Sequence, residues 1–262
     1  MNATQPIGEH LRVWRQRRRL SQLELAGDAE ISTRHLSFLE TGKAQPSREM
    51  VLRLAEQLDV PLRERNAMLM AAGFAPKFQE RALDHPSLKI VRQAIELVLT
   101  AHEPFPALAV DRHWTMVASN KAVAPLLGGV DASLLQPPVN VLRLSLHPKG
   151  LAPRIANLAE WRAHLLARLQ HQVQATANET LAALLEELKC YPGHGASSGR
   201  TASVRDYAGI VVPLELVTPK GTLAFFSTTT VFGTPVDVTL SELAVEAFFP
   251  ADAATAEALR RT

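Results

Sequence analysis

The sequence predicts a two-domain protein, in which an all-α N-terminal domain precedes an α+β domain with an antiparallel sheet. Residues 1–76 contain five short amphipathic segments, of which three follow a capping serine and two end at a glycine, which indicates helices. Residues 88–262 mix helical segments with runs rich in Val, Thr and Phe that flank turn residues. The length of 262 residues suits two domains of ordinary size.

Residues 21–42 predict two short helices joined by a tight turn. Ser21 and Glu24 form a capping box at the start of the first helix. Ser32 caps the second, and Gly42 ends it in the left-handed conformation that glycine favours. The outward face of this second helix carries hydrogen-bonding side chains suited to base edges and phosphates. This pattern indicates a helix-turn-helix motif.

Three further helices are expected around the motif. Ile7, Leu11 and Trp14 recur with helical spacing before it. Ser47 caps a helix after it, and residues 61–72 form another that glycine and proline close. The apolar side of each helix faces the others, so the five helices are expected to form one bundle.

This bundle resembles the lambda-repressor-like DNA-binding domain of the XRE family, through the segments SQ at 21–22, LETGK at 39–43 and PS at 46–47. The resemblance covers residues 7–76 and implies an ion pair between Arg15 and Glu40. It also implies contacts with double-stranded DNA from eight residues: Gln22, Ser32, Thr33, Arg34, Ser37, Phe38, Lys43 and Arg48. Phe38 departs from the polar residue often found in relatives, and it could contact a thymine methyl group or pack inside the protein. A helical bundle without a nucleic-acid role is the alternative.

Composition limits the class of protein. Residues 1–81 contain 13 Lys and Arg against 10 Asp and Glu, a net charge of +3, whereas the whole chain carries +2. This bias towards the first domain fits contact with DNA. Cys190 is the only cysteine, which excludes an intrachain disulfide and a zinc site built from cysteines. No apolar run approaches the roughly 18 residues of a membrane span, and the N-terminus lacks a signal-peptide core, so we expect a cytoplasmic protein without membrane contact.

The second domain follows a linker at residues 77–87 and is expected to occupy residues 88–262. Its first helix carries an apolar side formed by Leu88, Val91, Ile95 and Val98. A hairpin of residues 107–110 and 114–119 follows. We expect Asn120 to cap a helix that runs to about Leu127.

The remaining elements are two helices, a second hairpin and a closing helix. The helices are expected at residues 155–171 and 179–189, the hairpin strands at 209–217 and 222–232, and the closing helix at 241–249. Residues 193–203, GHGASSGRTAS, lack apolar anchors and are predicted to be the most flexible stretch. Helices combined with hairpins indicate an α+β domain.

The hairpin followed by an asparagine and a helix is similar to a PAS domain. Three segments resemble the ligand-binding domain of MmyB-like regulators: RLSLHPKGLAPRIANLAEWRAHLLARL at 143–169, LEELKCYP at 185–192 and VTLSELAVEAFFPAD at 238–252. The resemblance implies a transcription regulator that pairs an XRE-type head with a PAS-like domain for ligand binding and dimerisation. It also implies a small apolar, fatty-acid-like ligand.

A buried carboxylate needs a cation or strong hydrogen-bond donors. The first of these segments supplies candidate ligand-binding residues: Arg143, His147, Asn157, Trp161 and Arg162. Asn157, Trp161, His164 and Arg168 fall near one helical face by spacing. The alternative is a structural role, with Trp161 in the core and Arg162 in a surface ion pair.

Catalytic motifs are missing from the sequence. There is no HExxH, GxSxG or phosphate-binding loop. Of the nine histidines, His164 and His171 could share a helical face, but no carboxylate or cysteine is placed to complete a metal site with them. We therefore predict no catalytic residue, no metal and no cofactor, and the protein is not expected to be an enzyme. The sequence predicts a sequence-specific DNA-binding transcription regulator, which acts as a homodimer because paired heads read two half-sites. The alternative is an antitoxin-like or scaffold protein whose C-terminal domain binds a protein partner.

Overall fold

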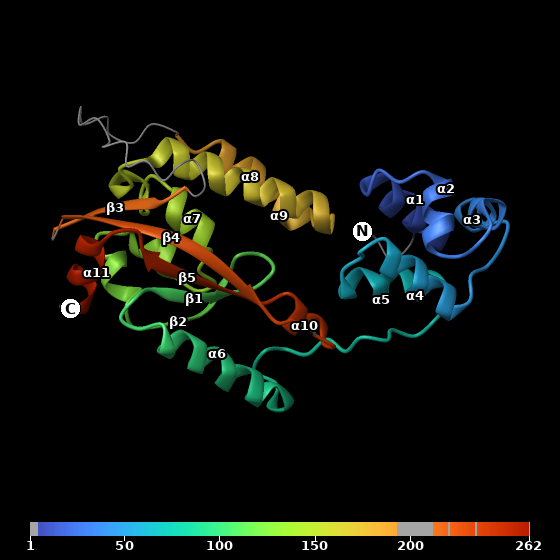
Figure 1. Cartoon of the computed structure of the whole chain (residues 1–262), viewed down its shortest axis with the longest axis horizontal. Coiled ribbons are helices and arrows are strands. Elements are labelled where there is room, and N and C mark those ends of the chain that lie inside the picture. Colours follow the sequence, from blue (N-terminus) through green and yellow to red (C-terminus); the bar gives the residue numbers. More distant parts are fainter. Residues whose placement is uncertain (1–4, 193–211, 220, 234, 262) are drawn as a thin grey trace. The chain divides into compact units, whose positions relative to one another are not determined.

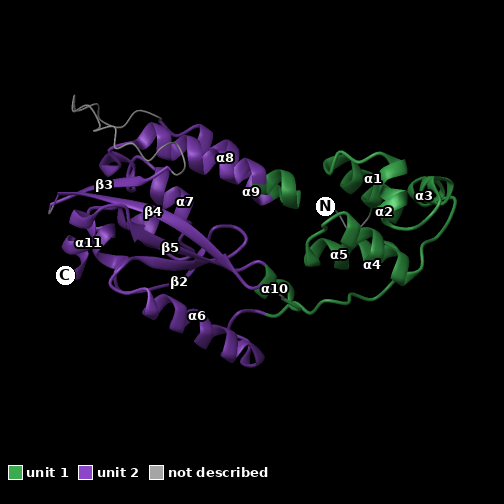
Figure 2. Cartoon of the chain, viewed as in Figure 1, with its two compact units in different colours: residues 1–81, 172–179, 235–241 green, residues 82–171, 180–234, 242–262 purple. Residues whose placement is uncertain are grey.

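The computed structural model describes residues 5–192, 212–219, 221–233 and 235–261. The chain forms two compact units (Figure 2). Unit 1 contains residues 1–81 together with two short segments from later in the chain, 172–179 and 235–241. Unit 2 contains residues 82–171, 180–234 and 242–262.

Most of unit 1 consists of the helices α1 (Ile7–Arg17), α2 (Gln22–Asp28), α3 (Thr33–Glu40), α4 (Arg48–Gln57) and α5 (Leu62–Ala71) (Figure 1). The hydroxyls of Ser21, Ser32 and Ser47 each accept a hydrogen bond from the backbone N–H three residues later, as predicted for caps. Glu24 completes the capping box of α2. Gly42 has a φ of 72°, the left-handed conformation predicted after α3. The predicted all-α character of this region is confirmed.

The core of unit 1 is formed by the inward faces of these helices. Leu11 and Trp14 of α1 and Leu36 and Leu39 of α3 are fully buried. Burial stabilises the fold by roughly 1.5–3 kcal/mol for each aliphatic side chain of this size. Gly8 allows α1 to pass close to the end of α3, because a Cβ atom at this position would lie 2.5 Å from the carbonyl oxygen of Leu39.

Unit 2 is built on a five-stranded sheet in the order β2-β1-β5-β4-β3. The strands are β1 (Ala107–Val110), β2 (Met116–Ser119), β3 (Leu214–Thr218), β4 (Gly221–Val231) and β5 (Ala244–Pro250), and every neighbouring pair is antiparallel (Figure 1). Both predicted hairpins are present, β1 with β2 and β3 with β4. β5 lies between them and joins them. This antiparallel sheet with its helices is a PAS-like α+β arrangement, as predicted.

The helices that follow α5 in the chain are α6 (Lys89–Ala101), α7 (Val141–Leu146), α8 (Leu158–Thr176), α9 (Glu179–Lys189), α10 (Val238–Ser241) and α11 (Ala253–Arg260). Short 3-10 turns occur at Pro86–Leu88, Ala124–Leu127, Ala132–Leu135 and Ala152–Arg154. α8 and α9 lie side by side (Figure 1), and Arg162 of α8 donates to the carbonyl of Lys189 at 2.8 Å. In α6, Ile95 and Leu99 are buried, whereas Val98, predicted on the inner side, is 47% exposed.

The predicted helix from Asn120 to about Leu127 is wrong, because the chain forms only a 3-10 turn at the end of this stretch. Asn120 is buried and does not cap a helix. Its Oδ1 accepts from the N–H of Ala107 at 3.1 Å, and its Nδ2 donates to the carbonyls of Leu99 and Phe105 at 3.1 and 2.8 Å. Buried backbone groups need hydrogen-bond partners, so the side chain ties the end of α6 to β1.

The closing helix predicted at residues 241–249 is also wrong, because this segment forms β5. Short apolar runs fit helix or strand equally by spacing, and Val245, Phe248 and Phe249 favour a strand. Pairing with β1 on one side and β4 on the other satisfies the backbone of β5. α11 was not predicted, although Asp252 caps it by accepting from the N–H of Thr255. The stretch 193–203 and residues 209–211 of the predicted strand lie outside the described residues.

Two later segments of the chain complete unit 1. Arg18, which follows α1, donates to the carbonyl of Leu58 at 2.7 Å and to that of Ala175, in the last turn of α8, at 3.4 Å. Arg81 donates to the Asp237 carboxylate at 2.9 Å. Arg18 therefore connects elements inside unit 1.

Candidate functional site

The outward face of α3 carries Thr33, Arg34, Ser37 and Phe38. Arg34 is exposed and the other three are half-buried. The guanidinium of Arg34 lies 5.3 Å from the centre of the Phe38 ring, and the Lys43 ammonium lies 5.9 Å from it. Both distances suit cation–π attraction. Phe38 therefore holds two cations at this surface and does not belong to the buried core of unit 1.

A hydrogen-bond network fixes the start of α2 against the end of α3. Glu40 accepts from the Nε and Nη2 atoms of Arg15 at 2.6 and 2.8 Å, which confirms the predicted ion pair. The same carboxylate accepts from Nε2 of Gln22 at 2.7 Å. The bond to Glu40 raises the pKa of Arg15, and the Glu40 side chain is only 3% exposed. The network holds the Gln22 amide in one orientation at the first turn of α2.

The remaining predicted DNA-binding residues flank α3. Ser32 caps it, with its Oγ accepting from the N–H of His35 at 3.1 Å, and its own O–H is still able to donate. Lys43 follows α3, Arg48 is the first residue of α4, and both are exposed. Helix N-termini attract phosphate through their free N–H groups and dipole. All eight predicted residues thus lie between the starts of α2 and α4, and their contact with DNA stays a prediction.

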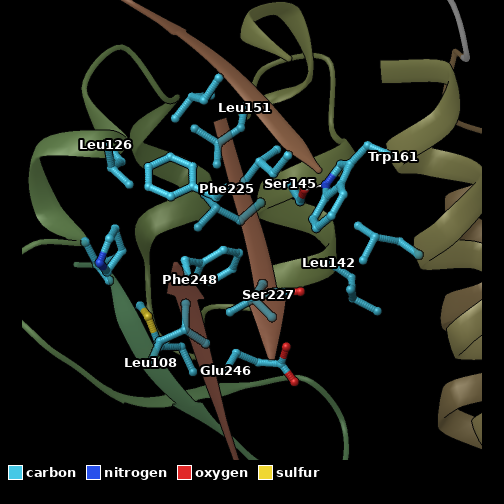
Figure 3. Close-up of a pocket in the computed structure, with 18 of the residues that line it drawn as sticks. Leu108, Leu126, Leu142, Ser145, Leu151, Trp161, Phe225, Ser227, Glu246 and Phe248 are labelled. Atoms are coloured by element: carbon cyan, nitrogen blue, oxygen red, sulfur yellow. Dashed lines mark hydrogen bonds between the residues drawn. The ribbon is translucent and has the colours of Figure 1, made fainter. Parts of the chain in front are cut away.

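Unit 2 contains a cavity of about 100 Å³ between the sheet and the helices α7 and α8 (Figure 3). Within the described parts of the chain, 21 residues line it, of which 17 are apolar, including Leu108 of β1, Leu142 of α7 and Phe248 of β5. The four polar residues among these 21 are Ser145, Arg168, Ser227 and Glu246. An apolar lining with a few polar groups is typical of a small-molecule site.

Arg168 of α8 and Glu246 of β5 form an ion pair at the edge of this cavity. The two side chains meet through two parallel bonds of 2.6 and 3.0 Å. Thr229 lies 2.6 Å from Nη2 of Arg168 and donates to Glu246 at 3.0 Å. The face of the guanidinium lies 4.6 Å from the Trp114 ring. Burial, followed by the charge of Arg168, lowers the pKa of the neighbouring His164, so this imidazole is neutral at pH 7.

Trp161 is the predicted ligand-binding residue that lines the cavity. The residue is 4% exposed, and its Nε1 donates to Oγ of Ser145 at 3.0 Å. Figure 3 shows the indole on the α8 side of the cavity, close to Ser145. Trp161 therefore combines a place in the core with a place in the cavity wall.

The other four predicted ligand residues do not line this cavity. Arg143 forms a bidentate pair with Glu187 at 2.8 and 2.7 Å. The ring of His147 stands edge-on to another aromatic ring, Asn157 donates to a backbone carbonyl at 2.8 Å, and Arg162 donates to carbonyls at the end of α9. Arg162 thus bonds backbone carbonyls instead of a carboxylate. A role of these four residues in ligand binding stays a prediction that the geometry of the cavity does not support.

The structure adds two ionisable residues to the candidate site that the sequence analysis did not select. Arg168 was placed on the same helical face as Trp161 by spacing, but it was not chosen. Glu246 lies within the apolar run AVEAFFP, where a lone carboxylate is unusual. Burial of that run would have required a partner for Glu246, although the sequence does not say which of the many cations supplies it.

The described parts of the chain contain no helix that is both long and apolar enough to span a membrane. The same residues contain no cluster of His, Cys, Asp or Glu side chains able to hold a metal ion. Cys190 is exposed.

Comparison with known protein families gives two matches. A model of the MmyB-like transcription regulator ligand binding domain matches residues 91–261. The chain belongs to this family. A helix-turn-helix domain model matches residues 6–68. This MmyB-like protein is therefore a DNA-binding transcription regulator with a ligand-binding domain, and the prediction that it is not an enzyme is confirmed.

No curated protein matches the chain significantly. Among solved structures, an RNA-binding light-oxygen-voltage receptor matches with 12% sequence identity and a TM-score of 0.27. The match covers 97% of this chain and 63% of the receptor chain. Similarity at this level carries no argument about function.

Proposed function

We propose that this MmyB-like regulator is a cytoplasmic homodimer that binds a specific DNA sequence and responds to a small apolar, fatty-acid-like ligand. The surface of α3 supports the DNA-binding part of the proposal, and the cavity of unit 2 supports the ligand. The ligand-binding domain in the family match favours this function over a protein-partner scaffold.

Sequence-specific binding rests on the chemistry of the α3 face. Thr33, Ser37 and the Gln22 amide supply neutral donors and acceptors, which read base edges in the major groove. Arg34 and Lys43 supply charge beside the Phe38 ring. Selection from random double-stranded oligonucleotides with the full chain tests this proposal. An enriched motif is expected, and enrichment of no motif would refute specific reading.

The ligand proposal rests on the cavity. The 17 apolar residues among its described lining suit a hydrocarbon chain, and the four polar residues suit one polar end group. An apolar cavity of about 150 Å³ can hold benzene, so about 100 Å³ admits a short part of such a chain. A longer chain requires lining side chains to move.

A route from ligand to DNA runs along α8. Trp161, Leu165 and Arg168 of this helix line the cavity, and its last turn belongs to unit 1, where Ala175 accepts from Arg18. A ligand shifts an equilibrium only if it binds the two states unequally, and such coupling is typically about 1–3 kcal/mol. Calorimetric titration of the ligand with and without bound DNA tests this route. Equal affinities in the two titrations would refute the coupling.

The homodimer proposal rests on α6. Ile95 and Leu99 bury one side of this helix, while Ile90 and Leu97 are 78% and 71% exposed. Ile90 and Leu97 are seven residues apart and therefore share a face. A second copy of α6 would cover this face, and two heads would then read two half-sites.

A further inference from the structure

We infer that the cavity selects a ligand whose polar end is an uncharged hydroxyl group, such as a medium-chain primary alcohol, over the corresponding fatty-acid anion. This inference rests on the proposed function, because it assigns the end group of the apolar ligand proposed for the same cavity. It follows from the ion pair between Arg168 and Glu246, and from the lack of a second cation among the described residues that line the cavity.

Arg168, the cation among the described lining residues, is already neutralised. Both terminal nitrogens of Arg168 donate to Glu246, one of them also contacts Thr229, and the guanidinium face rests on Trp114. Among the 21 lining residues that the structure describes, Arg168 and Glu246 are the ionised side chains, so the formal charges of these residues sum to zero. The nearby His164 is neutral at pH 7, because burial lowers its pKa, and so it supplies no further positive charge.

A fatty-acid carboxylate has two ways to enter this cavity, and both are unfavourable. It can lie beside the intact pair, where it adds a net negative charge to an apolar space next to the Glu246 carboxylate, and like charges at short distance repel strongly. It can instead replace Glu246 on Arg168. Glu246 is 5% exposed, so displacement leaves a buried carboxylate without its partner, and an uncompensated buried charge is strongly destabilising.

An alcohol meets neither obstacle. Its hydroxyl can donate to a Glu246 oxygen while the ion pair stays intact, because each carboxylate oxygen accepts more than one hydrogen bond. Its oxygen can accept from Ser227 or Ser145, whose hydroxyls also line the cavity. Hydrogen bonds to an ionised acceptor are the stronger kind. The ion pair thus favours a ligand whose end group donates a hydrogen bond and disfavours a ligand with a negative charge.

The test uses isothermal titration of the full chain with 1-octanol and with octanoate at pH 7.5, where the acid is ionised. The inference expects 1-octanol to bind at least ten-fold more tightly than octanoate. Octanoate binding as tightly as 1-octanol, or more tightly, overturns the inference and leaves the proposed apolar ligand standing. No heat of binding from either probe overturns both.

A matched pair of variants tests the role of the ion pair. Glu246→Gln removes the negative charge with little change in shape and frees Arg168 for an anion, so octanoate should gain at least ten-fold in affinity. Glu187→Gln makes the same change in the bidentate pair with Arg143, which lies outside the cavity lining, and it should leave both affinities unchanged. Unchanged octanoate affinity in folded Glu246→Gln overturns the inference.

A thermal melt reports whether Glu246→Gln folds. If it does not, the double variant Arg168→Gln/Glu246→Gln replaces it, because it removes both charges without leaving one unpaired. The double variant should keep the preference for 1-octanol and gain no affinity for octanoate. A gain for octanoate in the double variant overturns the inference, since no free cation would explain it.

Discussion

Replacement of Glu40 by alanine should destabilise the DNA-binding unit strongly. The Glu40 side chain is 3% exposed, that of Arg15 is 12% exposed, and the two meet through bonds of 2.6 and 2.8 Å. Gln22 loses its acceptor as well. Removing one partner of a buried pair typically costs about 3–5 kcal/mol, whereas an exposed pair contributes under about 1 kcal/mol.

We expect a loss near the lower end of the buried range. Arg15 keeps some solvent contact, and its Nη1 still donates to the carbonyl of Leu20 at 2.9 Å after the substitution. A loss of about 3 kcal/mol corresponds to a fall in the melting temperature of roughly 12–24 °C for a domain of this size. Glu40→Gln, which keeps an acceptor but loses the charge, should fall between wild type and Glu40→Ala.

The assay is hydrogen exchange of the full chain, read on the amides of α1 and α3, together with thermal melting. Glu56→Ala is the matched control, because Glu56 is an exposed glutamate in a helix of the same unit. The control should change the free energy of unfolding by no more than about 0.5 kcal/mol. If the amides of α1 and α3 are equally protected from exchange in Glu40→Ala and in Glu56→Ala, the ion pair does not stabilise the unit and the reasoning fails.

Three further predictions concern DNA, pH and assembly. Arg34→Ala should weaken binding to the selected DNA motif by roughly 1–3 kcal/mol and relax the preference at one base pair, whereas Arg48→Ala should lower the affinity for all DNA sequences alike. Mobility-shift assays on the motif and on sites with single base-pair changes distinguish the two effects. His10 is fully buried with neither ring nitrogen hydrogen-bonded within the described residues, and burial lowers its pKa. His10 therefore binds a proton more readily in the unfolded state, and the free energy of unfolding should fall as the pH drops below about 6.5, by at most about 1.4 kcal/mol per pH unit. Denaturant melts of His10→Leu should lack this pH dependence. An equal pH dependence in wild type and His10→Leu would contradict the assignment. Leu97→Glu should convert a dimer into a monomer in light scattering, whereas Glu96→Gln, at an exposed position of the same helix that does not share the face of Ile90 and Leu97, should not. An unchanged mass for Leu97→Glu would exclude the α6 face.

The head could be predicted closely because its signals are local. Serine caps, a capping box and a left-handed glycine each lie within a few residues of the helix end that they determine. The ion pair between Arg15 and Glu40 spans 25 residues, and it came from a family resemblance that carries such long-range information.

The ligand domain was predicted only in part, because its decisive contacts are not local. Asn120 fits a helix cap by sequence, but its real partners lie 13 to 21 residues away. Arg168 and Glu246 are 78 residues apart, and no spacing rule connects them. The strand character of β5 depends on two neighbouring strands that offer hydrogen bonds on both sides, whereas its short apolar run by itself fits a helix or a strand equally by spacing.

The position of β5 in the sheet has a consequence for the order in which the protein folds. β1–β2 and β3–β4 are hairpins of adjacent segments, whereas β5 aligns Ala247 with Ala107, across 140 residues of chain. Contacts of such long sequence separation form slowly, because the intervening loop must close first. During synthesis the DNA-binding unit can therefore fold while the two hairpins remain separate halves of the sheet, each with an unpaired edge strand. The cavity acquires Glu246, and with it a partner for Arg168, only when the last strand inserts.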